Sequence, residues 1–183
     1  MRKLTITALG SVYFGIVSML VFATVAFGEL WMYRNLTLWG AYFVWTLLFL
    51  GLGGVSFLPL IEPGTYRRRF PARFAIGFLG YALIWCCAYF LQPNTRGECV
   101  GCGVGSIVLA MVLNPPGMGR GGQFQSAGSL CVFSVLGYFA GAWANAAAGG
   151  PMGMLLWGVA FGLGTGAGIG LILGRLNIST SAP

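Results

Sequence analysis

The sequence predicts an all-α fold, a polytopic membrane helical bundle with six transmembrane helices and both termini in the cytoplasm. Three observations predict it. The chain of 183 residues is 57 % hydrophobic and only 7 % charged, whereas an average soluble domain is about 25 % charged. Apolar stretches of about 20 residues, the length that a helix needs to cross a bilayer, recur along the chain. The connections between them are short, so residues 1–183 are expected to form a single transmembrane domain without a soluble one.

Six apolar stretches mark the expected spans. They cover residues 4–28, 36–61, 74–92, 101–118, 127–148 and 152–174. The apolar run of the first stretch is longer than a signal-peptide core, which has about 7 to 15 residues, and this favours a true span. The fourth is short, because its uninterrupted apolar run extends only from Val100 to Leu113. A re-entrant segment is therefore an alternative at that position.

Basic residues decide between these topologies, because they concentrate on the cytoplasmic side of a membrane. With six crossings and the N-terminus inside, every Lys and Arg except Arg34 and Arg96 lies inside. If the fourth stretch fails to cross, Arg120 and Arg175 move outside as well. The charge pattern therefore favours six crossings, with localisation in a plasma or inner membrane.

The charged and metal-ligating residues exclude several classes of function. The net charge of +7 is explained by topology and by attraction to anionic membrane lipids, and it requires no nucleic acid. The sequence contains no histidine, and its three acids, Glu29, Glu62 and Glu98, lie at span ends or in a loop. No proton relay, voltage sensor or cation-coupling site is visible. We therefore expect no metal and no cofactor.

Three aromatic residues, Trp31, Tyr33 and Trp39, lie at the predicted outer rim. Amphipathic rings collect at such rims as anchors. Stacking against a quinone or a pigment is the alternative role.

Cys99 and Cys102 form a C-x-x-C motif in the stretch RGECVGCGVG, at the expected outer start of the fourth span. A helix N-terminus stabilises a thiolate, which makes such pairs reactive. The motif resembles the pair that membrane thiol oxidoreductases of the vitamin K epoxide reductase type carry at the start of a span. That resemblance implies thiol–disulfide chemistry with a membrane quinone, but those enzymes need a second pair, and no cysteine stands in another outer loop. A structural disulfide or inert thiols are the alternatives.

The stretch VLNPPGMGRGGQFQ, residues 112–125, is the most irregular part of the chain. Its two prolines end the preceding helix, and its glycines are expected to keep the following residues non-helical. A loop at the cytoplasmic rim is one interpretation, and a functional cavity or docking loop is the other. Arg120, Gln123 and Gln125 are its polar groups.

A row of glycines dominates the last span. Its members stand one helical turn apart and are Gly158, Gly162, Gly166, Gly170 and Gly174. They sweep about 160° of the helix surface. No strand, lysine or acid provides the context of a phosphate-binding loop. Small residues at this spacing instead let another helix approach closely, which predicts a packing strip.

The expected partner of this strip is the preceding span, where Gly137 and Gly141 belong to a similar row. Gly164 and Gly168 fall outside the strip, and Trp157, Phe161 and Ile172 are expected to face lipid or to fill gaps. The small-residue surface exceeds what one neighbour needs. The surplus predicts a second partner, either another helix of this bundle or another subunit.

Three functional hypotheses follow. The first is a non-catalytic structural or assembly subunit of a membrane complex or a homo-oligomer, because catalytic chemistry is sparse and packing surface is abundant. The second is a channel or carrier for a small neutral or weakly anionic solute, whose path would include Asn114, Arg120, Asn145 and Thr165. The third is a thiol–disulfide oxidoreductase that uses Cys99 and Cys102.

Overall fold

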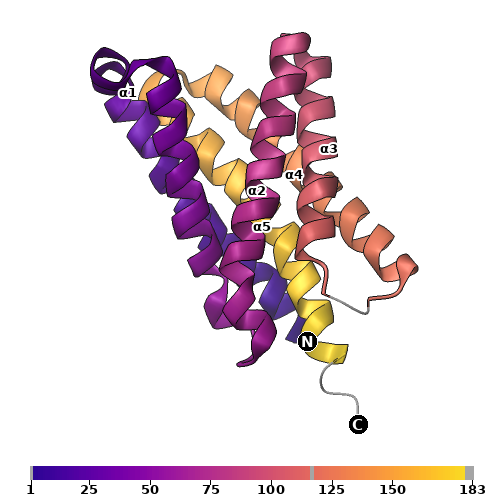
Figure 1. The fold of residues 1–183 in the computed structure, drawn as a ribbon. Coiled ribbons are helices and arrows are strands. Elements are labelled where there is room, and N and C mark those ends of the chain that lie inside the picture. Colours follow the sequence, from indigo (N-terminus) through magenta and orange to yellow (C-terminus); the bar gives the residue numbers. More distant parts are fainter. Residues whose placement is uncertain (1, 116–117, 180–183) are drawn as a thin grey trace.

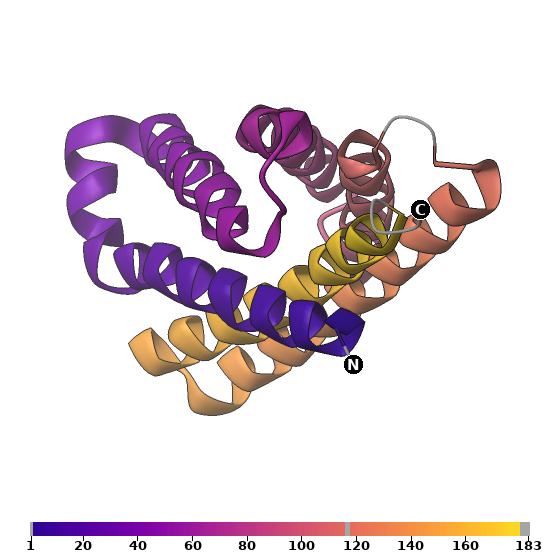
Figure 2. The ribbon, with the colours of Figure 1, turned by 90° about the horizontal axis from the view of Figure 1, so that it is seen from below.

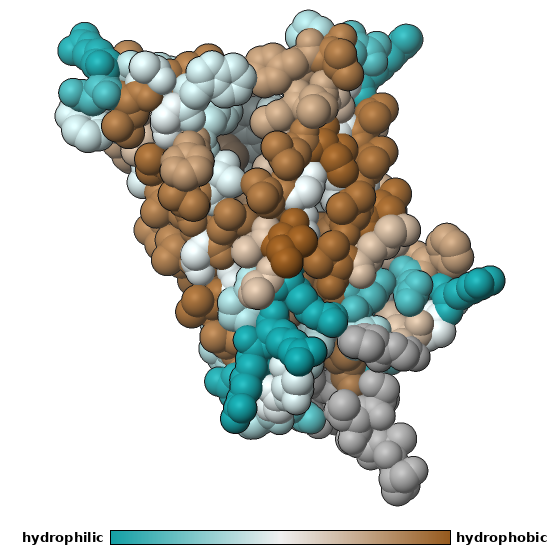
Figure 3. Space-filling model, viewed as in Figure 1, coloured by the Kyte–Doolittle hydropathy of each residue, from teal (hydrophilic) through white to brown (hydrophobic). Residues whose placement is uncertain are grey.

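The computed structural model describes residues 2–115 and 118–179, and within them the chain is helical, with no strand (Figure 1). The elements in order are α1 (Arg2–Ser56), η1 (Leu58–Leu60), α2 (Thr65–Leu91), α3 (Thr95–Leu113), α4 (Arg120–Ala148) and α5 (Gly150–Ser179). Among these described residues, five helices are long and apolar enough to cross a membrane, as expected of a multi-pass membrane protein. Figure 3 shows a broad hydrophobic surface between two ends that carry hydrophilic residues.

Helix α1 doubles back on itself. Its backbone leaves the helical conformation at Thr37, where φ is 62° and ψ is 173°, and Figure 1 shows the bend at the upper left. The rings of Phe14 and Phe57 lie 5.6 Å apart, although a straight helix would separate them by roughly 65 Å. The first two expected spans are therefore two antiparallel halves of α1, and the residues between them are helical rather than a loop.

The helical segments form a ring. The second half of α1 contacts α2, and α2, α3 and α4 each contact the next helix in the chain. Helix α5 then packs along α1, which closes the ring. Figure 2 shows this arrangement from below, with the first half of α1 lying across α5. The interior of the ring holds the buried aromatic core.

The glycine strip of α5 faces the first half of α1, which corrects the expectation that it faces residues 127–148. Gly158 lies against Phe22, Gly162 against Ser18, and Gly166 against Gly10. A methyl group on Gly170 would lie 2.8 Å from the Cα of Thr7, and one on Gly174 would lie 3.5 Å from the Cα of Lys3. The spacing of the glycines fixes the face of the helix, but it does not identify the neighbour that covers this face.

Helices α4 and α5 pack closely along a second seam, that is, a line of close contact between two helices. Gly164 and Gly168, the two glycines outside the strip, lie in this seam. Gly164 lies against the backbone of Gly137, and Gly168 lies against Leu130. Gly141 lies against Trp157. Both glycine faces of α5 are thus covered by helices of the same chain, so the surplus surface that suggested another subunit is used within the bundle.

Two large residues of α5, which were expected to face lipid or to fill gaps, fill gaps in the core. Phe161 and Ile172 are 6 % and 0 % exposed. They sit on the same side as the contacts with α1 and the interior of the ring. The helix is apolar on all sides, and its sequence therefore gives no contrast between a lipid face and a core face.

Three helices begin earlier than the apolar stretches predicted. Helix α2 begins at Thr65, so the arginines at 67–69 lie on its first turn and not in a loop. Helix α3 begins at Thr95, because the Asn94 side chain accepts hydrogen bonds from the backbone of Arg96 and Gly97. Helix α4 begins at Arg120, so Gly121 and Gly122 are helical. Hydropathy marks the apolar part of a helix, and in these three cases the helix itself extends beyond that part.

Thr37 gives a first prediction. Its backbone occupies a region that is essentially reserved for glycine and that costs another residue about 1 to 3 kcal/mol. We expect Thr37→Gly to raise the free energy of unfolding by about 1 kcal/mol, since the relief exceeds the entropic cost of glycine. Thr24→Gly, in a regular part of α1, should lower it. Unfolding in SDS titrations measures both variants, and a destabilised Thr37→Gly variant would contradict the strain at this bend.

Gly170 gives a second prediction. Its alanine variant forces a Cβ to within 2.8 Å of the Thr7 Cα and 2.9 Å of the Ile6 carbonyl oxygen. We expect Gly170→Ala to lower the free energy of unfolding by about 1 to 3 kcal/mol, as overpacking does. Gly128 on α4 provides the control, because no described atom lies within 4 Å of its Cβ position. Gly128→Ala should be neutral or stabilising, and equal effects of the two variants would be inconsistent with the α1–α5 seam.

Candidate ligand-binding site

A partly open cavity of about 300 Å³ lies inside the ring. It is lined by α1, α2, α4 and α5, and most of its lining side chains are aromatic. The aromatic members are Phe22, Tyr33, Tyr42, Trp45, Phe49, Phe78, Tyr81, Trp85, Tyr138, Trp157 and Phe161. Figure 3 shows a recess at the upper end of the molecule, between the bend of α1 and the end of α2.

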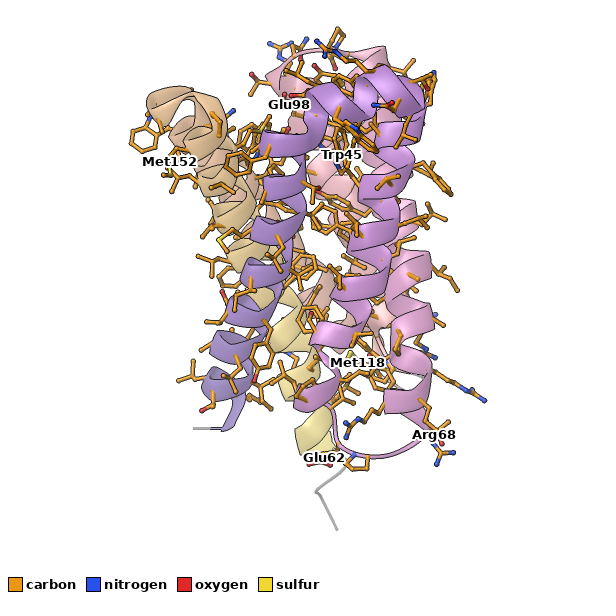
Figure 4. The ribbon with its side chains drawn as sticks, turned by 90° about the vertical axis from the view of Figure 1, so that its left-hand side faces the viewer. Trp45, Glu62, Arg68, Glu98, Met118 and Met152 are labelled. Carbon is orange, nitrogen blue, oxygen red and sulfur yellow. The ribbon has the colours of Figure 1, made fainter. Side chains whose placement is uncertain are left out.

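The cavity belongs to the end of the bundle opposite the arginine-rich one. In Figure 4, Trp45 lies among aromatic side chains toward the end that carries Glu98, while Glu62 and Arg68 lie at the other end. The lining residues agree with this placement, because Trp85 is near the C-terminal end of α2 and Met154 is near the N-terminal end of α5.

Stacked phenylalanine rings close the inner end of the cavity. Phe49 and Phe78 lie 5.1 Å apart in a stacked arrangement at its base. Phe74 stacks on Phe78 at 5.5 Å, and Phe14 lies 5.8 Å from Phe74. Phe14 and Phe74 are fully buried. The cavity is thus a closed-ended pocket and does not continue as an open path through the bundle.

The polar tips of four lining side chains are buried, and two of them lack a partner among the described residues. The indole N–H groups of Trp45 and Trp157 have none, whereas the Trp85 indole and the Tyr138 hydroxyl interact with each other. An unsatisfied buried donor costs about 1 to 3 kcal/mol, and buried Trp and Tyr usually find a partner for their polar tip. The two free indole donors therefore need a partner from water or from a bound molecule.

Glu29 is the charged residue of the lining, which contains no other among the described side chains. It lies one turn before Tyr33, whose hydroxyl is its hydrogen-bond partner, and its charge also acts on the hydroxyl of Tyr42. Tyr33 and Tyr42 pack edge to face against Trp45, with ring centroids 6.1 and 5.5 Å away. A carboxylate therefore borders a corner built from three aromatic rings.

The rim aromatics divide into two groups. Trp31 and Trp39 are 63 % and 72 % exposed and point outward, as rim anchors do. Tyr33 instead lines the cavity. The signal that sequence reasoning missed is the set of Trp and Tyr residues inside the spans, such as Trp45 and Trp85, where a polar tip needs a partner.

The residues of the expected solute path do not line this cavity, as far as the described side chains show. Asn114 is buried at the end of α3, where its carbonyl oxygen accepts a hydrogen bond from Arg73. Thr165 is buried within α5, and Asn145 lies beside Gly153 in the last turn of α4. Arg120 is the exposed first residue of α4. The structure places these four at separate points along the bundle.

The C-x-x-C motif lies inside α3 rather than at its N-terminus. The cap at Asn94 satisfies the first backbone N–H groups, and Cys99 and Cys102 follow one and two turns later. Cys99 is exposed, whereas Cys102 is fully buried and accepts a contact from the Tyr81 hydroxyl at 3.6 Å. All five cysteines, each within the described residues, are free thiols. The geometry provides neither a disulfide nor the helix-terminal activation that the sequence suggested.

No group of three or more acidic or cysteine side chains that could hold a metal ion is present in the described part of the chain. The chain matches no protein-family model. It also matches no curated protein and no solved structure. The fold is that expected of a multi-pass membrane protein, and its distinguishing feature is the aromatic pocket.

The two cysteines of the motif give a third prediction. N-Ethylmaleimide should modify Cys99 in the folded protein and should reach Cys102 only after denaturation in SDS, because Cys102 is fully buried. Mass spectrometry of the peptide that contains both residues measures the outcome. A Cys99–Cys102 disulfide in protein purified without reductant would contradict this arrangement.

Proposed function

We propose that the protein is a membrane-embedded binding protein for a small aromatic solute, acting as the capture component of a carrier. The observation that carries the proposal is the closed-ended aromatic cavity with the unpartnered indole N–H groups of Trp45 and Trp157. Ligand pockets are typically concave and apolar, with a few polar groups that fix orientation. The volume of about 300 Å³ suits a molecule of one or two rings.

The topology that accompanies this proposal has six crossings with both termini in the cytoplasm. The two antiparallel halves of α1 supply two crossings, and α2 to α5 supply one each. The arginines of α2 lie at the end opposite the cavity. Because basic residues favour the cytoplasmic side, the pocket then opens toward the outer side, where a solute arrives.

A channel is less consistent with this geometry than a carrier. An open channel needs a continuous polar path, whereas here stacked phenylalanines close the inner end of the cavity. A carrier binds its solute in a pocket that is closed on one side at a time. The closed-ended cavity therefore supports binding followed by a conformational change.

A role as a structural subunit of a larger complex stays a prediction. Its positive argument was a surplus of small-residue surface on α5, and the α1 and α4 seams use that surface. The third hypothesis, thiol–disulfide chemistry, has little support from a pair of which one member is fully buried.

Filling the cavity tests the proposal. Ala82 lines the pocket, and its neighbour Leu83 is 58 % exposed on the outer surface of α2. We expect Ala82→Trp to weaken solute binding by at least about tenfold, because the indole occupies the cavity. Leu83→Trp adds the same bulk outside the pocket and should leave binding unchanged.

The measurement uses calorimetric titration of the full chain in phosphatidylcholine nanodiscs. The probes are three two-ring molecules of similar shape, namely 1-methylquinolinium, 1-methylnaphthalene and 1-naphthoate. Partitioning into lipid is the same for both variants, so specific binding is the part that Ala82→Trp loses. If no probe binds specifically to the wild-type protein, the proposed function is wrong.

A further inference from the structure

We infer that the solute is an organic cation, held by the Glu29 carboxylate and by the faces of the aromatic rings around it. This inference rests on the proposed function of solute binding and specifies its charge. It differs from the expectation of a neutral or weakly anionic solute, whose path was expected to include Arg120. Arg120 is exposed at the first residue of α4 and does not line the cavity.

The first argument is the state of Glu29. Within the described residues it forms no ion pair, and its neighbours in the lining are aromatic or apolar. Arg34 and Arg96 are exposed and stand outside the lining. The Glu29 side chain is partly exposed, and the Tyr33 hydroxyl is its hydrogen-bond partner. No basic side chain of the described lining neutralises the carboxylate, so it is available to pair with a bound cation.

The second argument is the arrangement of the rings beside the carboxylate. Tyr33 and Tyr42 both meet Trp45 edge to face, at interplanar angles of 71° and 79°. Perpendicular rings present faces from more than one direction to the same space. A cation within about 6 Å of such faces is attracted by the ring quadrupoles, and tryptophan is the strongest partner. Aromatic corners of this kind are suited to amines and quaternary ammonium groups.

The third argument excludes an anion. The lining contributes no basic side chain among the described residues, so an anionic solute would meet an uncompensated negative charge. The indole N–H groups could donate to a carboxylate, but neutral acceptors on a cationic solute, such as a hydroxyl or a carbonyl oxygen, satisfy the same donors. Charge complementarity therefore favours a cation that carries hydrogen-bond acceptors.

The experiment compares the three probes and two carboxylate variants in the same nanodiscs. The cation 1-methylquinolinium should bind at least about tenfold more tightly than neutral 1-methylnaphthalene and anionic 1-naphthoate. Glu29→Gln should weaken binding of the cation by at least about tenfold and should leave binding of the neutral probe unchanged. Glu98→Gln, which removes a carboxylate at the same end but outside the lining, should have no effect.

The outcomes separate the two proposals. If the neutral or anionic probe binds as tightly as the cation and Ala82→Trp still abolishes binding, the pocket binds solutes but the inference of a cation is wrong. The same conclusion follows if Glu29→Gln binds the cation normally. If the cation binds equally to Ala82→Trp, or if no probe binds, both proposals are wrong. Thermal unfolding of Glu29→Gln, expected to match the wild type, shows that any loss of affinity is not a loss of fold.

Discussion

Close contact between helix backbones at glycines is the interaction on which the rest of this structure depends. In a bilayer, apolar side chains gain little by leaving lipid for protein, so helices associate through close packing. Helix α5 has glycines on two faces, and they bring it against α1 on one side and α4 on the other. A single methyl group at Gly162 or Gly164 would collide with a neighbouring backbone. These two seams set the distances at which the ring of helices closes.

The interior of the ring is a consequence of these tight seams. Most of the seam contacts are made by glycine backbones, and many aromatic residues of α1, α2 and α5 gather in the interior. Phenylalanine has no polar atom, and the phenylalanines of the inner half stack into a closed plug. Toward the other end, Trp and Tyr replace Phe, and their polar tips require partners. The change from Phe to Trp and Tyr along one interior therefore separates a filled half from a half that contains a cavity.

Sequence reasoning could predict the membrane class and the packing role of the glycine rows, because both follow from composition and helical periodicity. It could not predict that α1 covers the strip, since periodicity defines a face and not its neighbour. The bend at Thr37 was also not predictable. The residues on both sides of Thr37 are helical, so their sequence has the local pattern of an ordinary helix. The cavity required knowing which aromatic residues converge. Tyr33 and Trp45 are equally aromatic in the sequence, and only the folding back of α1 brings them together.

The seams also determine which part of the bundle is able to move. In the proposed carrier, release of a solute toward the arginine-rich end would require the phenylalanine plug to open. That plug links Phe57, which directly follows α1, to Phe70 and Phe74 of α2. The contact between α1 and α2 is less extensive than those of α5 with α1 and α4. A displacement there would preserve both glycine seams of α5, whereas a displacement at α5 would break two of them. The second half of α1, bounded by the bend at Thr37, is therefore the segment whose movement would couple the cavity to the other side of the membrane.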